Sequence, residues 1–298
     1  MQQTDTFFPP SINLAGRLVT FGEPQVMGIL NVTSDSFFAA SRVSGAEAVV
    51  ARARQILDEG GTMVDVGACS TRPGSTPVDE DEEWRRLDGA LAVLRRELPE
   101  AIVSVDTFRA DVARRCVQEY GVQIINDISG GERDPQMFET VAELGVPYVL
   151  THDGSLSPTP SAADEAWLAS VARYLAERLQ RLYDLGVADV ILDPGFGFGK
   201  TLEQNYLLLR RLGDFIRLFP SCPFLVGVSR KRMVWQLLGI TPDEALNGTT
   251  VLHTVALQAG AHLLRVHDVR AAVEAIKTIE AIDAIDAIDA IEAINRKS

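Results

Sequence analysis

Polar side chains capable of chemistry follow nearly every short apolar run of this sequence. Asn31, Asp106, Asn126 and Asp193 stand at the ends of four such runs, and the other runs lead into Asp65, Thr151, His152, Ser229, Lys231, Arg265, His267 and Asp268. A lone Asp or Asn in such a place is more often a helix cap or a turn former. Acids, amides and paired basic residues at eight converging positions exceed what capping requires, so they predict a site for binding or catalysis.

Two common site motifs are absent from the sequence. The segment DPGFGFGKT at 193–201 is similar to a phosphate loop, but a Walker A motif requires glycine where Pro194 stands. The four histidines form no HExxH spacing and no CxxC pair accompanies them, so we interpret His253 and His262 as structural. Neither a nucleotide loop nor a histidine metal site is predicted.

The apolar runs alternate with amphipathic helical stretches, a pattern typical of a parallel sheet with crossover helices. Strands are predicted at 26–30, 63–66, 102–105, 122–126, 146–151, 189–192, 224–228 and 262–266, and helices at 46–60, 110–121 and 166–186, among others. A doubly wound open sheet is the alternative, but GILNVTSDSF after the first run lacks a glycine-rich nucleotide fingerprint. We predict an α/β fold, a single-domain (β/α)8 TIM barrel over residues 21–280, with the site at the carboxyl ends of its strands.

Length and composition agree with one barrel in a reducing compartment. The 298 residues exceed the typical barrel length of about 250 only slightly. The net charge of −13 argues against a surface for nucleic acid or anionic membrane, so any anion site must be local. Cys69, Cys116 and Cys222 are odd in number and widely spaced, which favours the cytoplasm over a disulfide framework. The first twenty residues, treated as an N-terminal extension, match neither a secretory signal nor a membrane span.

The C-terminal segment repeats isoleucine at every third position from Ile276 to Ile294. Each step of three falls about 60° short of a full helical turn, so the isoleucines spiral around a helix. Only the first few can face one core. We interpret 281–298 as a repetitive tail, helical or frayed, beyond the last barrel helix; a partner-binding helix is the alternative.

The same polar stretches resemble the dihydropteroate synthases. The similarity extends from about Val26 to Val269 and is carried by MGILNVTSDSF, DVGACSTRPG, SVDT, INDI, LDPGFGFGKT, GVSRK and RVHDV, in the order of that family. Related pterin-binding methyltransferase barrels share acidic and amide positions but not the STRPG, SRK and RVHD set. The resemblance implies that 6-hydroxymethyl-7,8-dihydropterin diphosphate condenses with p-aminobenzoate, giving dihydropteroate and diphosphate in folate biosynthesis. It also implies Mg²⁺, a homodimer and inhibition by sulfonamides.

The resemblance assigns roles to residues at the strand ends. For the pterin it implies Asp106, Asn126, Asp193, Phe198 and Lys231. For the diphosphate it implies Asn31, Thr71, Arg72, Arg265 and His267, with Mg²⁺ at Asn31. For p-aminobenzoate it implies Thr71, Arg72, Pro73, Phe198 and Arg232. The catalytic set is expected to comprise Asn31, Asp35, Arg72, Lys231, Arg265 and His267.

The sequence departs from the family pattern at several of these loops. Ser34 stands where proline is usual, and residues 39–41, Ala-Ala-Ser, replace a common Asp-Gly-Gly. Thr151 replaces a methionine that often covers the pterin, and Arg232 replaces a serine near the p-aminobenzoate carboxylate. Two alternatives stay open. One is a pterin-binding methyltransferase that has no use for the diphosphate residues. The other, motivated by the altered first loop, is a silent paralogue that binds pterin diphosphate without releasing pyrophosphate.

Overall fold

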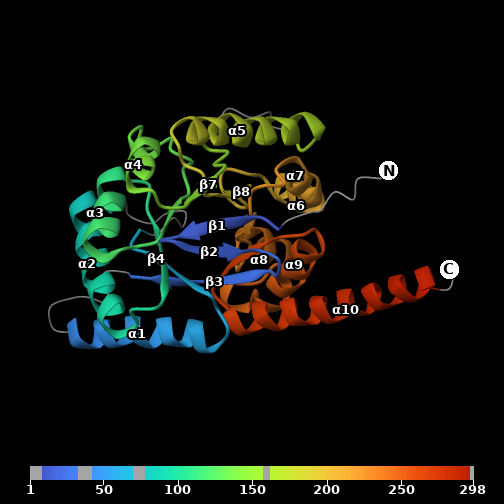
Figure 1. Cartoon of the computed structure of the whole chain (residues 1–298), viewed down its shortest axis with the longest axis horizontal. Coiled ribbons are helices and arrows are strands. Elements are labelled where there is room, and N and C mark those ends of the chain that lie inside the picture. Colours follow the sequence, from blue (N-terminus) through green and yellow to red (C-terminus); the bar gives the residue numbers. More distant parts are fainter. Residues whose placement is uncertain (1–8, 33–41, 70–77, 157–161, 296–298) are drawn as a thin grey trace.

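A closed parallel barrel forms the body of the molecule. The computed structural model describes residues 9–32, 42–69, 78–156 and 162–295 (Figure 1). Its main sheet has eight parallel strands in the order β8-β7-β6-β5-β4-β3-β10-β9. A bridge between Leu192 and Phe224 joins the two outer strands and closes the ring. The predicted single-domain (β/α)8 barrel is confirmed.

The elements follow one another as the alternation of the sequence predicts. The barrel strands are β3 (Gln25–Asn31), β4 (Met63–Gly67), β5 (Ile102–Asp106), β6 (Ile124–Asp127), β7 (Tyr148–Thr151), β8 (Val190–Asp193), β9 (Leu225–Val226) and β10 (Leu263–Val266). The helices are α1 (Arg42–Asp58), α2 (Glu80–Glu97), α3 (Ala110–Tyr120), α4 (Met137–Leu144), α5 (Glu165–Asp184), α6 (Leu202–Arg210), α7 (Leu212–Leu218), α8 (Arg232–Leu238), η2 (Pro242–Glu244), α9 (Leu246–Gln258) and α10 (Val269–Asn295). Each predicted strand overlaps an observed one.

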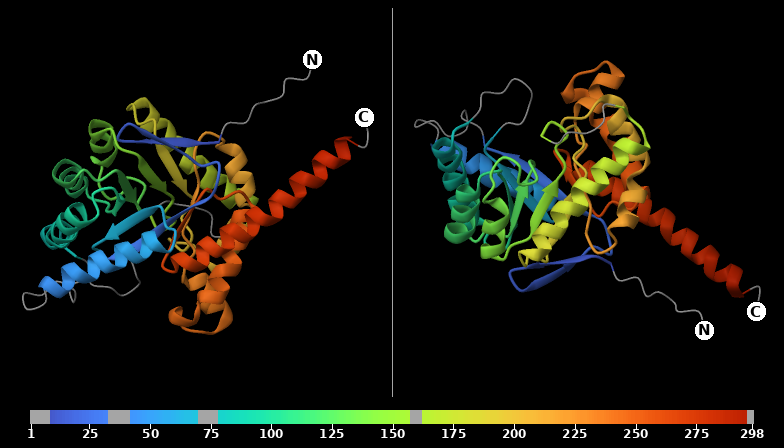
Figure 2. Two further views of the ribbon diagram at one scale, coloured as in Figure 1. Left: turned by 60° about the horizontal axis from the view of Figure 1, so that its bottom comes forward. Right: turned by 90° about the horizontal axis from the view of Figure 1, so that it is seen from above.

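An apolar layer fills the barrel interior at the amino ends of the strands. Its buried members from the barrel strands are Met27, Met63, Ile124, Val149, Ile191, Leu225 and Leu263. A hairpin of β1 (Ser11–Leu14) and β2 (Arg17–Thr20) covers this end and adds Ile12, Leu14 and Val19 to the same cluster. Figure 2 shows the hairpin lying across one end of the barrel. No strand was predicted from the sequence for these residues.

The last helix extends beyond the barrel that it packs against. Ile276 and Ile279 are buried, whereas Ile282 and Ile285 are 48% and 60% exposed. Figures 1 and 2 show α10 projecting away from the other elements toward the C-terminus. These exposures match the expectation that only the first isoleucines of the repeat face the core. Within the described part of the chain, no helix is long and apolar enough to cross a membrane.

Candidate active site

A polar layer lies directly above the apolar layer, toward the carboxyl ends of the strands. Asp65, Asn126, Asp193 and Arg265 each stand two residues after a member of the apolar layer. Side chains two residues apart on a strand point to the same face, so these four point into the barrel. Asp65 is fully buried, and Asn126 and Asp193 are 2% and 5% exposed. The strand pattern therefore places charges in the barrel interior at the end where such barrels carry their chemistry.

Arg265 joins two carboxylates from neighbouring strands. Its Nε donates to Asp65 Oδ2 over 2.6 Å, and its Nη2 donates to Asp106 Oδ2 over 2.7 Å. The Nδ2 of Asn126 also donates to Asp65 Oδ2, over 3.1 Å. Four side chains from β4, β5, β6 and β10 thus form one hydrogen-bonded network across the barrel mouth.

The guanidinium of Arg265 is shared by the carboxylates of Asp65 and Asp106, and this sharing affects the pKa values of the network. Burial raises the pKa of Asp106 to about 7, and the Asp65 charge adds to this effect while Arg265 opposes it. Burial acts to lower the pKa of Arg265, but the two carboxylates outweigh it and raise that pKa above the ordinary arginine value. Arg265 therefore stays charged, and Asp106 is the member that changes protonation near neutral pH.

The glycine-rich segment after β8 is folded around Asp193 and Lys200. Asp193 Oδ1 accepts a 2.7 Å hydrogen bond from the amide of Gly195, and burial raises the pKa of Asp193. Lys200 is 3% exposed, and its Nζ donates to the carbonyls of His152, Gly195 and Phe198 over 2.9, 2.7 and 3.2 Å. The lysine that gives this segment its likeness to a phosphate loop thus holds the loop backbone.

Lys231 and Phe198 lie together beside this loop. Lys231 Nζ is 4.2 Å from the centre of the Phe198 ring and donates to the carbonyl of Phe196. Burial lowers the pKa of Lys231 to about 8, and the charge of Asp193 is the largest effect that opposes this shift. Gly197 has φ +82°, and a Cβ there would lie 3.0 Å from Lys231 Cδ, so glycine is required for this packing. The structure thus brings four of the residues expected to bind pterin, Asp106, Asn126, Asp193 and Lys231, to one side of the mouth.

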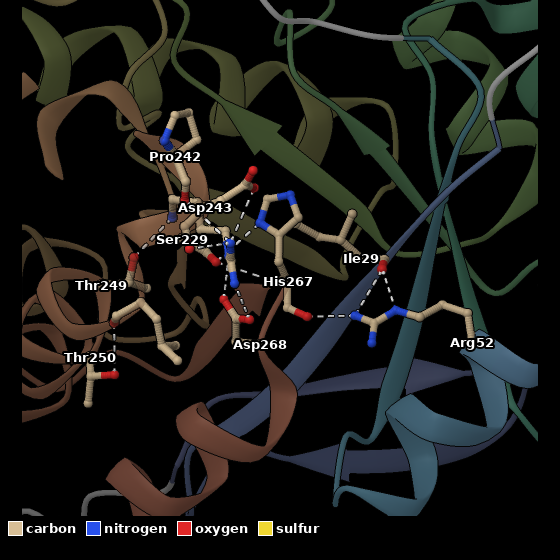
Figure 3. Close-up of polar contacts among 11 residues, drawn as sticks. Ile29, Arg52, Ser229, Pro242, Asp243, Thr249, Thr250, His267 and Asp268 are labelled. Atoms are coloured by element: carbon tan, nitrogen blue, oxygen red, sulfur yellow. Dashed lines mark hydrogen bonds and ion pairs between the residues drawn. The ribbon is translucent and has the colours of Figure 1, made fainter. Parts of the chain in front are cut away.

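Polar contacts join the loops after β9 and β10 (Figure 3). His267 Nδ1 lies 3.2 Å from Ser229 Oγ, which also accepts a hydrogen bond from the His267 amide over 3.1 Å. Arg230 binds Asp268 through Nε and Nη2, over 2.7 and 2.8 Å. These two pairs tie the serine-arginine-lysine loop to the loop that carries His267.

An arginine from the first barrel helix connects this region to β3. Arg52 on α1 donates to the carbonyl of His267 over 2.6 Å and to that of Ile29 over 3.4 Å (Figure 3). Asn31, two residues after Ile29, ends β3 and is exposed at the mouth. A Cβ on Gly67 would lie 3.6 Å from Asn31 Oδ1 and 3.8 Å from Asp106 Oδ2, so glycine leaves space between these two oxygens.

Several expected site residues lie outside the described part of the chain: Asp35, Thr71, Arg72 and Pro73. The residues flanking 70–77 are held by arginines, because Arg86 donates to the carbonyl of Ala68 over 3.0 Å and Arg109 to that of Val78 over 2.7 Å. Arg109 also pairs with the buried Glu83. Arg232, the first residue of α8, is exposed. A groove of about 1070 Å³ at the opposite, hairpin end of the barrel includes none of the expected site residues.

Comparison with known proteins agrees with this geometry. Residues 27–267 match the family model of the pterin binding enzymes. The dihydropteroate synthase of Escherichia coli K12 is 39% identical over 268 residues, covering 88% of this chain and 92% of that protein. The Xanthomonas albilineans dihydropteroate synthase with 4-aminobenzoic acid superposes with a TM-score of 0.82 at 38% identity, covering 93% of this chain and 99% of that one. The Yersinia pestis dihydropteroate synthase in a sulfonamide complex gives 0.81 at 34% identity, covering 92% and 99%.

The chain belongs to the dihydropteroate synthase family of pterin binding enzymes. For this family member, two contributors to the site were not assigned from the sequence. Asp65 was noted at a strand end but given no role, although a charge inside the apolar run MVDVG was the available signal. Lys200 was compared only with a phosphate-loop lysine, and nothing in the sequence indicates its three carbonyl partners.

Proposed function

We infer that this chain catalyses the dihydropteroate synthase reaction, joining 6-hydroxymethyl-7,8-dihydropterin diphosphate to p-aminobenzoate with release of diphosphate. The observation that carries this inference is the convergence of Asp106, Asn126, Asp193 and Lys231 at the mouth of a barrel that matches the family over residues 27–267. A pterin ring has an edge of N–H donors. Buried carboxylates and an amide supply the acceptors that such an edge requires.

In this proposal the pterin lies against the side of the mouth formed by β5, β6 and β8. Asp106, Asn126 and Asp193 accept from its N–H groups, and Lys231 donates to a ring nitrogen or the carbonyl. Phe198 packs beside Lys231, so the flat ring has an aromatic neighbour. Asn126 and Asp193 are buried, and the low dielectric around them strengthens their polar contacts.

The diphosphate is proposed to bind next to the pterin, near Asn31, Thr71, Arg72, Arg265 and His267. Mg²⁺ prefers oxygen ligands and commonly keeps one or two protein ligands together with substrate phosphates. The exposed amide oxygen of Asn31 fits such an ion, and the described residues hold no cluster of three His, Cys, Asp or Glu that would form a complete protein cage. When bound, the ion would offset negative charge on the departing diphosphate. Arg265 adds positive charge, and both Arg265 and His267 add hydrogen-bond donors from the protein.

The chemical step breaks the bond between the pterin methylene carbon and the diphosphate oxygen and forms a bond from that carbon to the amine nitrogen. The amine of p-aminobenzoate then loses one proton to water. We propose that p-aminobenzoate is held by Thr71, Arg72, Pro73, Phe198 and Arg232. We also propose that Asp35 supplies the catalytic carboxylate of the first loop. The protein mainly aligns the two reactants and stabilises the leaving group. Sulfonamides are expected to compete for the p-aminobenzoate position.

A homodimer and a cytoplasmic location complete the proposal. Leu237 and Leu238 at the end of α8 and Val251 on α9 are each more than half exposed, which gives neighbouring helices an apolar surface. Replacing Val251 with lysine should therefore convert a dimer to a monomer in light scattering coupled to size exclusion. Unchanged dimer would contradict this surface as the interface. The three cysteines are free, as a reducing compartment requires.

The direct test is pyrophosphate release from the purified protein given the pterin diphosphate, Mg²⁺ and p-aminobenzoate, with each component omitted in turn. Release and dihydropteroate formation that need all three components would support the synthase. Binding of the pterin diphosphate without release would instead indicate a silent paralogue. Methylfolate binding without p-aminobenzoate turnover would indicate a methyltransferase.

A further inference from the structure

A fully buried carboxylate lies beneath the proposed pterin site. Asp65 is the third residue of β4 and is in register with Ile29 on β3 and Ser104 on β5. Its Oδ2 accepts from Arg265 on β10 and from Asn126 on β6. In the ring of strands, β4 is two strands from β6 and two strands from β10. Asp65 therefore links side chains from both directions across the interior.

The two contacts restrict the groups that Asp65 holds. Arg265 is bound at Nε by Asp65 and at Nη2 by Asp106, and two attachment points fix the plane of a guanidinium. An ionised carboxylate only accepts hydrogen bonds, so Nδ2 of Asn126 must face Asp65. The Oδ1 of Asn126 is then the oxygen left to accept a hydrogen bond from a ligand.

The burial of this carboxylate is unfavourable for stability alone. Its other oxygen, Oδ1, is buried and makes no hydrogen bond to the described residues. Met63, two residues earlier on the same strand, shows that an apolar side chain packs inside this barrel. A buried ion pair often stabilises a fold no better than apolar residues of similar size. A role in orienting Arg265 and Asn126 accounts for the buried charge of Asp65.

We propose that Asp65 is a positioning residue of the pterin site, which orients Arg265 and Asn126 without touching the pterin itself. The proposal rests on the function proposed above. It separates Asp65 from Asp106 and Asp193, which would accept hydrogen bonds from the ligand directly. Its effect should accordingly appear in pterin affinity. It should pass through Asn126, and through Arg265 to the pterin acceptor Asp106.

The test is a thermodynamic cycle measured by calorimetry with 6-hydroxymethyl-7,8-dihydropterin, using Asp65→Asn, Arg265→Ala and the double variant. Asp65→Asn keeps the shape but removes the charge, and we expect about 10-fold weaker binding. In the Arg265→Ala background the same substitution should weaken binding less than in the wild type, because one of its two partners is gone. In steady-state assays, Asp65→Asn should raise KM for the pterin diphosphate and leave KM for p-aminobenzoate unchanged.

Ser104→Ala is the matched control, since Ser104 is buried in register with Asp65 and its Oγ has no partner among the described residues. It should bind pterin as the wild type does. If Asp65→Asn does not fold, Arg265→Lys gives the second test, because a lysine ammonium lacks the planar, two-point attachment of a guanidinium. This variant should also bind pterin about 10-fold less tightly. Wild-type affinity in Asp65→Asn or Arg265→Lys, or equal losses in both backgrounds, would overturn the positioning role alone. A wild-type protein that binds no pterin would overturn the proposed function itself, and the positioning role with it.

Discussion

The two layers inside the barrel are built on the same strands but have opposite chemistry. At the amino ends, Met63 on β4 and Leu263 on β10 belong to an apolar cluster covered by the β1–β2 hairpin. Two residues further on, the same strands carry Asp65 and Arg265, which form an ion pair of 2.6 Å. Two residues along each strand therefore separate a hydrophobic core from a charged network.

This difference separates stability from function within a single interior. Apolar groups in the lower layer gain free energy by burial and have no polar atoms to satisfy. Charged groups in the upper layer lose hydration, and their partners offset only part of this free-energy cost. The pKa values of Asp106 and Asp193 are raised, with burial as the first cause, and these shifts reflect that cost. The upper layer is thus prepared for a ligand at the expense of stability.

The largest expected effect comes from the lower layer. Met63→Ala should reduce the free energy of unfolding by about 2–5 kcal/mol, because the residue is fully buried and its removal leaves a cavity. Pterin affinity should stay within about twofold of the wild type while the protein is folded, because Met63 lies below the polar network. Chemical denaturation and calorimetry measure the two quantities. Met63→Leu, which nearly conserves volume, should lose less than about 1.5 kcal/mol. A large loss of pterin affinity in Met63→Ala would contradict the separation of the layers.

The upper layer should give the reverse result. Asp193→Asn is expected to weaken pterin binding about 100-fold, or ~2.7 kcal/mol, because an acceptor for a buried N–H is lost. Its free energy of unfolding at pH 8 should be equal or higher, because the substitution removes a charge that burial disfavours. The Asn Oδ1 can still accept from the amide of Gly195. Calorimetry and denaturation of the same sample decide this, and a protein that binds normally but unfolds more easily would reverse our assignment.

The sequence was sufficient for the barrel because the signals for its strands are local. Apolar runs, their spacing and the glycine after α3 mark elements without knowledge of the tertiary structure. Gly121, for example, ends α3 with φ +59°, in the left-handed region that glycine favours. The hairpin was missed because its strands have four residues each and its turn, Ala15-Gly16, differs from the Asn-Gly or Asp-Gly that signals such turns most strongly.

The partners within the site were not predictable in the same way. Asp65 and Arg265 are 200 positions apart in the chain, and their contact depends on the stagger of strands around the ring. Asp65 is in register with Ile29 on β3, whereas Arg265 is in register with Met27 on the same strand. The two side chains therefore meet although their positions along β3 differ by two residues. Such offsets follow from barrel closure and not from local pattern. The sequence therefore identified the strand ends that carry the site but not which side chains bind one another.

The smallest expected effect is a pH dependence that only the upper layer should show. The pKa of Asp106 is raised to about 7 by burial, with Asp65 and Asp127 adding to the shift and Arg265 and Lys231 opposing it. Protonated Asp106 donates a hydrogen bond, whereas a pterin N–H requires an acceptor. The carboxylate fraction falls from about one half at pH 7 to about a tenth at pH 6, so pterin affinity should fall about fivefold over that interval.

The sign for stability is opposite to the sign for binding. A raised pKa means that the folded protein retains a proton on Asp106 that the unfolded chain has released, so this residue's contribution to stability falls as the pH rises from about 4 to 7. Binding therefore strengthens over the pH range in which Asp106 weakens the fold. Asp106→Asn should abolish the fivefold change between pH 6 and 7, and Met63→Ala should keep it. If Asp106→Asn kept the full change in pterin affinity between pH 6 and 7, a group other than Asp106 would be responsible for the pH dependence.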